Sequence, residues 1–224
     1  MQTRTQNTNH KQTEAPQKHL RWMIIVIALV AVAAIIGGVI LFINPPKKPY
    51  APNTPEGVSE TFIKAYYTRD YVTRFSLTYH NTRQQWEDNA VKNTGSQEQF
   101  FAISQQQADE RGIEAEIHSF DDYYACYYRF IQEDMKAMFG NYTLTTEVIE
   151  STPMDAEELA RKKADLLGAV DTKYVDEAGL DTVTEGYTVN IRLTVKGTLK
   201  THTESYLVHV ILYDGRWAVI SHSI

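Results

Sequence analysis

One segment limits what this chain can fold into more than any other. Residues 22–43 form a run of 22 residues without a single charge, and nearly all of them are apolar. At 1.5 Å per residue, a helix of this length spans about 33 Å, which matches a bilayer core of about 30 Å. A signal-peptide core is shorter and precedes a small-residue cleavage site, whereas Asn44 and Pro45 follow here. We therefore predict an uncleaved transmembrane signal anchor over residues 20–43, in contact with the lipid bilayer.

Positive charge near the ends of the span orients it in the membrane. Four Lys or Arg residues precede the run, with Lys18 and Arg21 close to it, and Lys47 and Lys48 follow it. This bias favours a cytoplasmic N-terminus in a single-pass protein of the cell membrane. The predicted parts are a disordered cytoplasmic tail (1–19), the anchor (20–43), a Pro-rich linker (44–54) and an extracytoplasmic domain (55–224).

Small residues recur at a spacing of four within the span, as Ala33 with Gly37 and Ala34 with Gly38. Such pairs let two helices approach closely in a bilayer. Helix packing through these four residues, and with it a homo-oligomer, is therefore one hypothesis. The alternative is that Ala and Gly are simply common in membrane helices.

The predicted domain is acidic. Residues 53–224 hold 16 of the 22 Lys and Arg residues and 27 of the 28 Asp and Glu residues, which leaves a charge of −11. Phosphate backbones repel such a surface, so we expect no nucleic-acid partner. Cys126 is the only cysteine, which excludes an intrachain disulfide, and its apolar neighbours predict a buried thiol.

Helix caps and apolar residues at helical spacing predict five helices in the domain. The first opens at Thr54-Pro55 with Val58, Phe62 and Ala65 inward; the others cover 82–92, the segment from Ser96 to Gly112 with Phe100 and Ile103 inward, 122–139, and a stretch from Thr152 to Gly168. For 122–139 an aromatic strand is the alternative. Alternation of apolar and acidic residues predicts a short, half-buried strand over Ile113–Ile117.

Strand patterns dominate the C-terminal part. A strand is predicted over Tyr142–Glu150, and Tyr187–Lys196 alternates strictly between apolar and polar residues. A strand over Glu204–Tyr213 leads into Asp214-Gly215, a tight turn signal, and Arg216–Ser223 returns antiparallel. Helices first and an antiparallel meander last predict an α+β domain that ends in a long hairpin.

This order resembles the nuclear-transport-factor-like cone fold, also called the SnoaL or ketosteroid-isomerase-like fold. The resemblance rests on the segment Ala65-Tyr-Tyr-Thr-Arg-Asp70-Tyr71 and on the closing hairpin from Tyr206 through Asp214-Gly215-Arg216-Trp217 to Ile220. It implies a cone-like domain with a curved antiparallel sheet. The arrangement also looks like the membrane-anchored scaffold subunits of type IV secretion and conjugation machines.

Catalytic motifs do not emerge from the sequence. It contains no G-x-S-x-G, P-loop or dinucleotide fingerprint, and no histidine pair at metalloprotease spacing. His202, His209 and His222 fall on the terminal strands, where solvated or singly hydrogen-bonded histidines are favoured over a metal site. The acidic pairs Asp109-Glu110, Asp121-Asp122 and Glu157-Glu158 are interpreted as solvated faces or helix starts, not as general acid–base couples. We predict no catalytic residue, no metal and no cofactor.

Four tyrosines, Tyr123, Tyr124, Tyr127 and Tyr128, lie within six residues. On a helix, Tyr123/Tyr127 and Tyr124/Tyr128 would form two adjacent columns. Tyrosine suits protein interfaces because a rigid apolar ring carries a polar tip. The cluster is our candidate partner-binding surface, and rings packed in the core are the alternative.

These features favour a non-enzymatic accessory or scaffold protein of a bacterial envelope, which binds other envelope proteins through its extracytoplasmic domain, in conjugation or secretion. The alternative is a membrane-tethered cone domain that binds a small molecule or is an enzyme. An enzyme would need a pocket with convergent polar groups.

The topology is testable with protease. Added to spheroplasts, protease should digest the C-terminal domain and leave a small membrane-bound stub, because the anchor is retained with the domain outside. Immunoblotting against tags at either end measures both fragments. If the domain is digested only after lysis, it lies in the cytoplasm and the predicted orientation is wrong.

Overall fold

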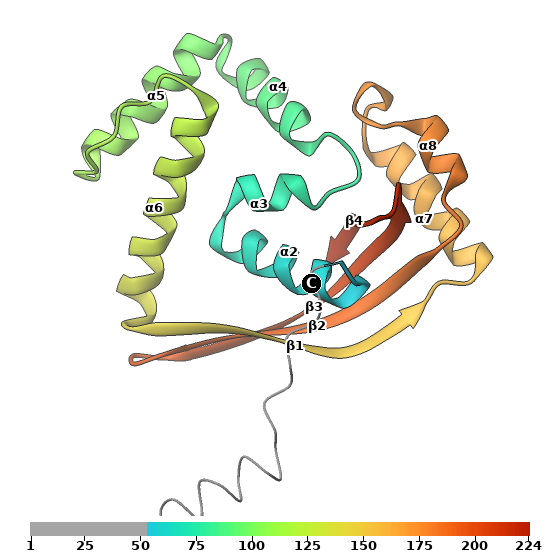
Figure 1. Cartoon of the computed structure of the whole chain (residues 1–224). Coiled ribbons are helices and arrows are strands. Elements are labelled where there is room, and N and C mark those ends of the chain that lie inside the picture. The colour runs from blue at the N-terminus through green and yellow to red at the C-terminus, as the bar shows by residue number, and fades with distance from the viewer. Residues whose placement is uncertain (1–52) are drawn as a thin grey trace, which may run out of the picture. The chain divides into compact units, whose positions relative to one another are not determined.

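The structure, a computed structural model, describes residues 53–224, which belong to one compact unit. This unit is α+β, with seven α-helices and one four-stranded antiparallel sheet among the described residues (Figure 1). The predicted anchor over 20–43, with Ala33, Ala34, Gly37 and Gly38, lies outside the described residues. Within 53–224, no helix is both long and apolar enough to cross a bilayer.

The elements follow one another in an order close to the predicted one. They are α2 (Pro55–Thr68), α3 (Tyr71–Ser76), α4 (Thr82–Thr94), α5 (Gln97–Glu110), α6 (Phe120–Phe139), β1 (Tyr142–Pro153), α7 (Ala156–Ala169), the 3₁₀ turn η1 (Thr172–Tyr174), α8 (Glu177–Thr182), β2 (Gly186–Gly197), β3 (Thr201–Tyr213) and β4 (Arg216–Ser223). All five predicted helices are found, and the segment around 122–139 is helical. The predicted start of the last helix at Thr152 is wrong, because β1 continues to Pro153 and Asp155 caps α7. The short elements α3, η1 and α8 were not predicted.

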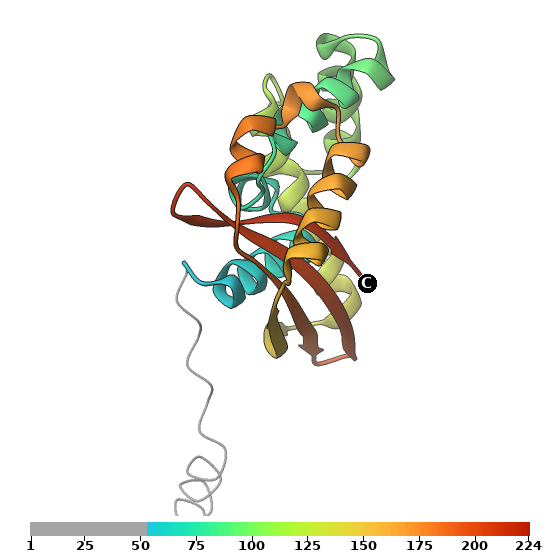
Figure 2. The same ribbon diagram turned by 90° about the vertical axis from the view of Figure 1, so that its right-hand side faces the viewer.

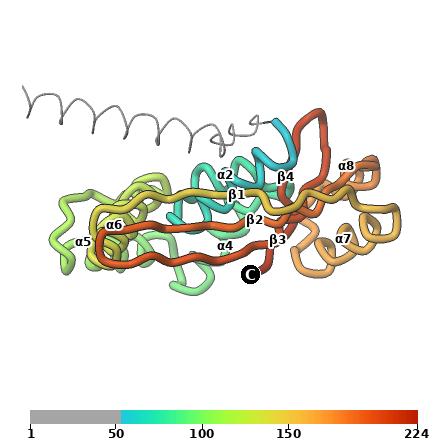
Figure 3. The backbone as a smooth tube through the Cα atoms, turned by 90° about the horizontal axis from the view of Figure 1, so that it is seen from below, coloured from blue at the N-terminus to red at the C-terminus, as the bar shows by residue number. Residues whose placement is uncertain are grey.

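The four strands form a simple meander in the order β1-β2-β3-β4. Figure 3 shows β1, β2 and β3 running side by side. The register places Ile191 of β2 between Val148 of β1 and Tyr206 of β3. Asp214 and Gly215 have φ of 50° and 71°, as a tight turn between twisted strands requires. The predicted closing hairpin is therefore confirmed.

One face of the sheet packs on α2. Thr54 caps this helix by accepting a hydrogen bond from the Gly57 amide, and Pro55 begins it as predicted. Its buried residues join alternate residues of all four strands in one cluster: Val58, Phe62, Ile63, Val148, Val189, Ile191, Leu193, Tyr206, Val208, Val210 and Val219. Trp217 is half-buried beside this cluster, with its ring 5.4 Å from that of Tyr187.

The other face of β3 and β4 packs on α7 and α8. Ile211, Ala218 and Ile220 alternate with the residues that contact α2, and they cluster with Leu159, Leu166 and Leu180. Figure 2 shows α7 on one side of these strands and α2 on the other. The C-terminal hairpin is thus covered on both faces, which explains its nearly continuous apolar sequence.

The outer edge of β4 is also covered. Thr78 forms a parallel bridge to Val219, the Tyr79 amide donates to the Val219 carbonyl, and the Val219 amide donates to the Leu77 carbonyl. The Tyr79 hydroxyl donates to the Asp176 carbonyl at the start of α8. This segment protects part of an edge that would otherwise offer free hydrogen-bonding groups.

Two predictions about residues 97–117 are wrong. Ile113–Ile117 is not a strand, although Ile113 and Ile117 are buried, because the side chain of Gln105 takes the place of a partner strand: its amide group donates to the Ala115 carbonyl and its oxygen accepts from the Ile117 amide, each at 2.9 Å. Ile103 is 46% exposed, since the buried residues of α5 are Ser104 and Ala108.

The end of α6 contacts the β2–β3 turn at Gly197. A Cβ added there would lie 2.1 Å from the Phe139 carbonyl oxygen, and the Leu199 amide donates to that same oxygen at 3.0 Å. Only glycine therefore allows this approach of backbone to backbone. The contact anchors the long helix α6 on the sheet.

Gly197→Ala should destabilise the domain by about 2–3 kcal/mol because the new methyl group cannot fit. Gly168→Ala is the matched control: an added Cβ meets nothing within 4 Å on α7, and alanine should stabilise the helix by up to about 1 kcal/mol. Urea unfolding of both variants measures the difference. Equal effects would show that α6 and the turn are not in close contact.

Candidate functional site

Helices α3 to α6 are joined by aromatic rings. Trp86 of α4 lies at the centre, with ring centroids 5.4 Å from Tyr71, 5.3 Å from Tyr123 and 5.8 Å from Phe100. Other rings surround it: Phe75, Phe101, Phe120, Tyr124, Tyr127 and Phe130. We call this set the ring cluster. Aromatic pairs in such offset or edge-to-face arrangements stabilise a fold beyond the apolar area that they bury.

The four predicted tyrosines of α6 differ in burial. Tyr124 is 2% exposed, Tyr123 and Tyr127 are half-buried, and Tyr128 is 40% exposed. Tyr123 and Tyr127 stack as expected, with centroids 5.6 Å apart and planes at 19°. The second expected column is wrong: Tyr124 and Tyr128 make no ring contact in the described structure, because Tyr124 packs between Tyr71 and Phe75 instead.

A polar chain holds the buried hydroxyl of Tyr124. This hydroxyl donates to Glu87 Oε1 at 3.2 Å, and Arg83 contacts both Glu87 at 2.8 Å and Asp121 at 3.0 Å. Burial, followed by the charge of Glu87, raises the pKa of Tyr124 above its ordinary value. Burial likewise raises the pKa of Tyr71. These phenols are therefore neutral at physiological pH and act as hydrogen-bond donors and ring surfaces, not as bases.

A groove opens between α3 and α6, with a volume of about 450 Å³. Its lining residues are Asp70, Tyr71, Val72, Asp121, Tyr124, Ala125 and Tyr128. Val72 is 57% exposed, so Val72 and Tyr128 offer apolar surface to solvent, whereas the two aspartates supply negative charge. We call this site the acidic groove. It brings two of the four predicted tyrosines together with residues from α3 that the sequence did not indicate.

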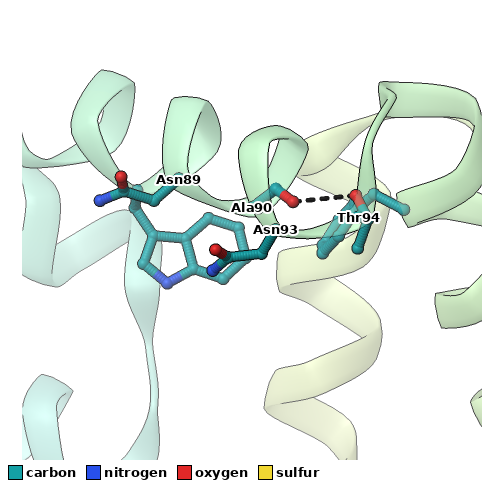
Figure 4. A pocket seen from close by; sticks show the side chains of 6 residues that line it. Asn89, Ala90, Asn93 and Thr94 are labelled. Carbon is teal, nitrogen blue, oxygen red and sulfur yellow. Dashed lines mark hydrogen bonds between the residues drawn. The ribbon is translucent and has the colours of Figure 1, made fainter.

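A second pocket lies beside the ring cluster, between α4 and α5. This pocket, of about 280 Å³, is lined by Trp86, Asn89, Ala90, Asn93, Thr94 and Phe100. Figure 4 shows Asn89 and Asn93 among the lining side chains, and the dashed line marks the hydrogen bond that the Thr94 hydroxyl donates to the Ala90 carbonyl at 2.9 Å. It offers an apolar floor with two amides at the rim.

The other residues considered from the sequence lie elsewhere. Ser119 caps α6 by accepting from the Asp122 amide, and the Asp122 carboxylate accepts from the Ser119 hydroxyl and the His118 amide, so this acidic pair lies at a helix start. His209 is buried and hydrogen-bonded to Ser221, and His202 pairs with Glu204. Within residues 53–224, no three His, Cys, Asp or Glu side chains lie close enough to hold a metal ion.

Cys126 is 2% exposed, and burial raises the pKa of its thiol. The predicted buried thiol is confirmed. It packs with Ala108, Ile113, Ile117 and Phe130, which joins α6 to α5 and to the segment between them.

Substitutions at Tyr124 and at Tyr128 should differ in their effect on the free energy of unfolding, because only Tyr124 is buried. Tyr124→Ala should cost about 3–5 kcal/mol, because a buried ring is lost, and Tyr124→Phe about 1 kcal/mol, because Glu87 loses a donor. Tyr128→Ala should change stability by less than about 0.5 kcal/mol. Chemical denaturation of the three variants measures these differences. A large loss for Tyr128→Ala would place its ring in the core.

No family model, no curated protein and no solved structure matches this chain. A functional assignment therefore rests on the geometry of the domain and on the sequence. The resemblance to cone-fold domains stays a prediction, which the order of the elements motivates.

Proposed function

We propose that this protein is a non-enzymatic accessory or scaffold subunit of a bacterial envelope, whose folded domain binds a basic segment of a partner protein in the acidic groove. The observation that carries the proposal is the composition of this groove. Exposed Val72 and Tyr128 lie beside Asp70 and Asp121 on two helices that the ring cluster holds together.

The chemistry of the groove favours a peptide with positive and apolar side chains. Carboxylates attract Lys and Arg, and the exposed face of Tyr128 can accept a cation or an aliphatic stem. The charge of −11 on residues 53–224 would steer a basic partner towards the domain. Asp121 already contacts Arg83 at 3.0 Å, which holds this carboxylate in place at the rim.

Rigidity also suits this surface for binding. Tyr71 and Tyr124 are fixed by ring contacts of 5.4–5.6 Å to each other and to Phe75 and Trp86. A partner would therefore meet aromatic groups whose rotamer freedom is already restricted, which lowers the entropy cost of association.

The membrane setting of this proposal comes from the sequence. The predicted span over 20–43 would tether the domain outside the cell membrane, and the cone-like form would belong to a scaffold of conjugation or secretion. The alternative, a membrane-tethered cone domain that binds a small molecule or is an enzyme, is favoured by a further pocket, which Arg74 of α3 lines together with two histidines.

Site-specific photocrosslinking in cells tests the proposal. A photoreactive amino acid at position 72, in the full-length protein, should crosslink to one defined envelope protein. Tyr128→Lys should weaken this adduct at least tenfold, because it removes ring surface and repels a basic segment; a hot spot of about 2 kcal/mol corresponds to a larger loss.

Leu199→Lys is the matched control, since Leu199 is 69% exposed on the β2–β3 turn, away from the groove. It should leave the adduct unchanged. Equal adducts in wild type and Tyr128→Lys, or equal losses in both lysine variants, would reject the groove as the binding surface.

A further inference from the structure

A pocket of about 240 Å³ lies where the covered part of the β4 edge ends. It is lined by Phe62, Arg74, Thr78, His80, Thr82, Val219, Ile220, Ser221 and His222. These residues come from α2, α3, α4, the segment between α3 and α4, and β4. Arg74, His80 and His222 thus reach one cavity from three separate parts of the chain. We call it the cationic pocket.

Arg74, His80 and His222 have no acidic partner among the described residues. Within residues 53–224, no ion pair or hydrogen bond of the Arg74 guanidinium is found; it lies 4.8 Å above the Tyr71 ring and 5.3 Å above the Phe75 ring. The buried Nδ1 of His80 has no hydrogen-bond partner in this part of the chain. His222 makes ring contacts to Phe62 at 5.1 Å and Tyr66 at 4.4 Å.

Burial makes this arrangement costly without a ligand. All three groups are half-buried, and burial lowers the pKa of Arg74, His80 and His222 below their ordinary values. A desolvated donor without an acceptor costs free energy that an anion would recover. The rest of the domain is acidic, yet none of the nine lining residues is Asp or Glu.

The shape of the donor set indicates an oxyanion. A guanidinium offers two parallel N–H groups to a carboxylate or phosphate, and each imidazole adds a donor. Thr82, at the start of α4, also lines the pocket, and its hydroxyl is hydrogen-bonded to that of Thr78 at 2.6 Å, whereas Phe62, Val219 and Ile220 supply an apolar wall. A neighbouring pocket shares Ile220, Ser221 and His222 and adds Lys162, but it also contains Asp165, which disfavours an anion there.

We infer that the cationic pocket binds the carboxylate or phosphate group of a small molecule, with Arg74 as its principal ligand and His80 and His222 as further donors. This site is separate from the acidic groove, which attracts the opposite charge. The inference therefore does not depend on the proposed scaffold function.

Isothermal titration calorimetry of the full-length protein in mild detergent, with inorganic phosphate and with benzoate as probes, tests the site. Ionic strength is held constant with chloride. At least one probe should bind saturably, and it should shift the imidazole NMR signals of His80 and His222. Saturation by phosphate alone would assign a phosphate ligand, and by benzoate alone a carboxylate with an apolar body.

Arg74→Gln should weaken the binding at least tenfold. Arg111→Gln is the matched control, because Arg111 lies 4.9 Å above the Phe130 ring outside the pocket, and it should bind like wild type. His222→Asn, which keeps Arg74 in place, should weaken binding at least threefold and serves if Arg74→Gln fails to fold. No saturable heat with either probe, or equal binding in all variants, would overturn the inference.

Discussion

Helix α2 contacts all four strands of the sheet, and the rest of the domain depends on this packing. Its buried residues Val58, Phe62 and Ile63 meet alternate residues of each strand, so one helix holds the meander together. The left-handed conformation of Arg69, at φ 57°, then ends α2, and its amide donates to the Ala65 and Tyr66 carbonyls. The chain turns here into α3, which supplies residues to both proposed sites.

The short helix α3 connects the two sites. Tyr71 lines the acidic groove, Arg74 lines the cationic pocket, and the guanidinium of Arg74 lies 4.8 Å above the Tyr71 ring. The two sites thus use neighbouring residues of one short helix, whereas the groove's carboxylates lie outside it, Asp70 at its N-cap and Asp121 in α6. A domain with a charge of −11 can in this way retain a half-buried guanidinium, because aromatic rings rather than carboxylates surround Arg74.

Local patterns were sufficient for most of the fold. The cap at Thr54, the alternation in Tyr187–Lys196 and the turn at Asp214-Gly215 each depend on neighbouring residues, and each is found in the structure. The strand predicted at Ile113–Ile117 is absent from the structure. Buried and exposed residues do alternate there, but no strand of the described residues pairs with this segment. Gln105, eight residues before Ile113, satisfies that backbone, and no local pattern reveals such a contact.

The sequence by itself determined the α+β class, the order of the long elements, the uneven charge and the tyrosine cluster, because these follow from composition and from periods of two and 3.6 residues. Tertiary structure alone decided which tyrosine is buried and which is exposed. It also brought His222 of β4 to one cavity with Arg74 and His80, which lie about 140 residues earlier in the chain. Such a site is produced by long-range packing of α2, α3 and β4, and that packing depends on contacts between segments whose separation in sequence carries no periodic signal.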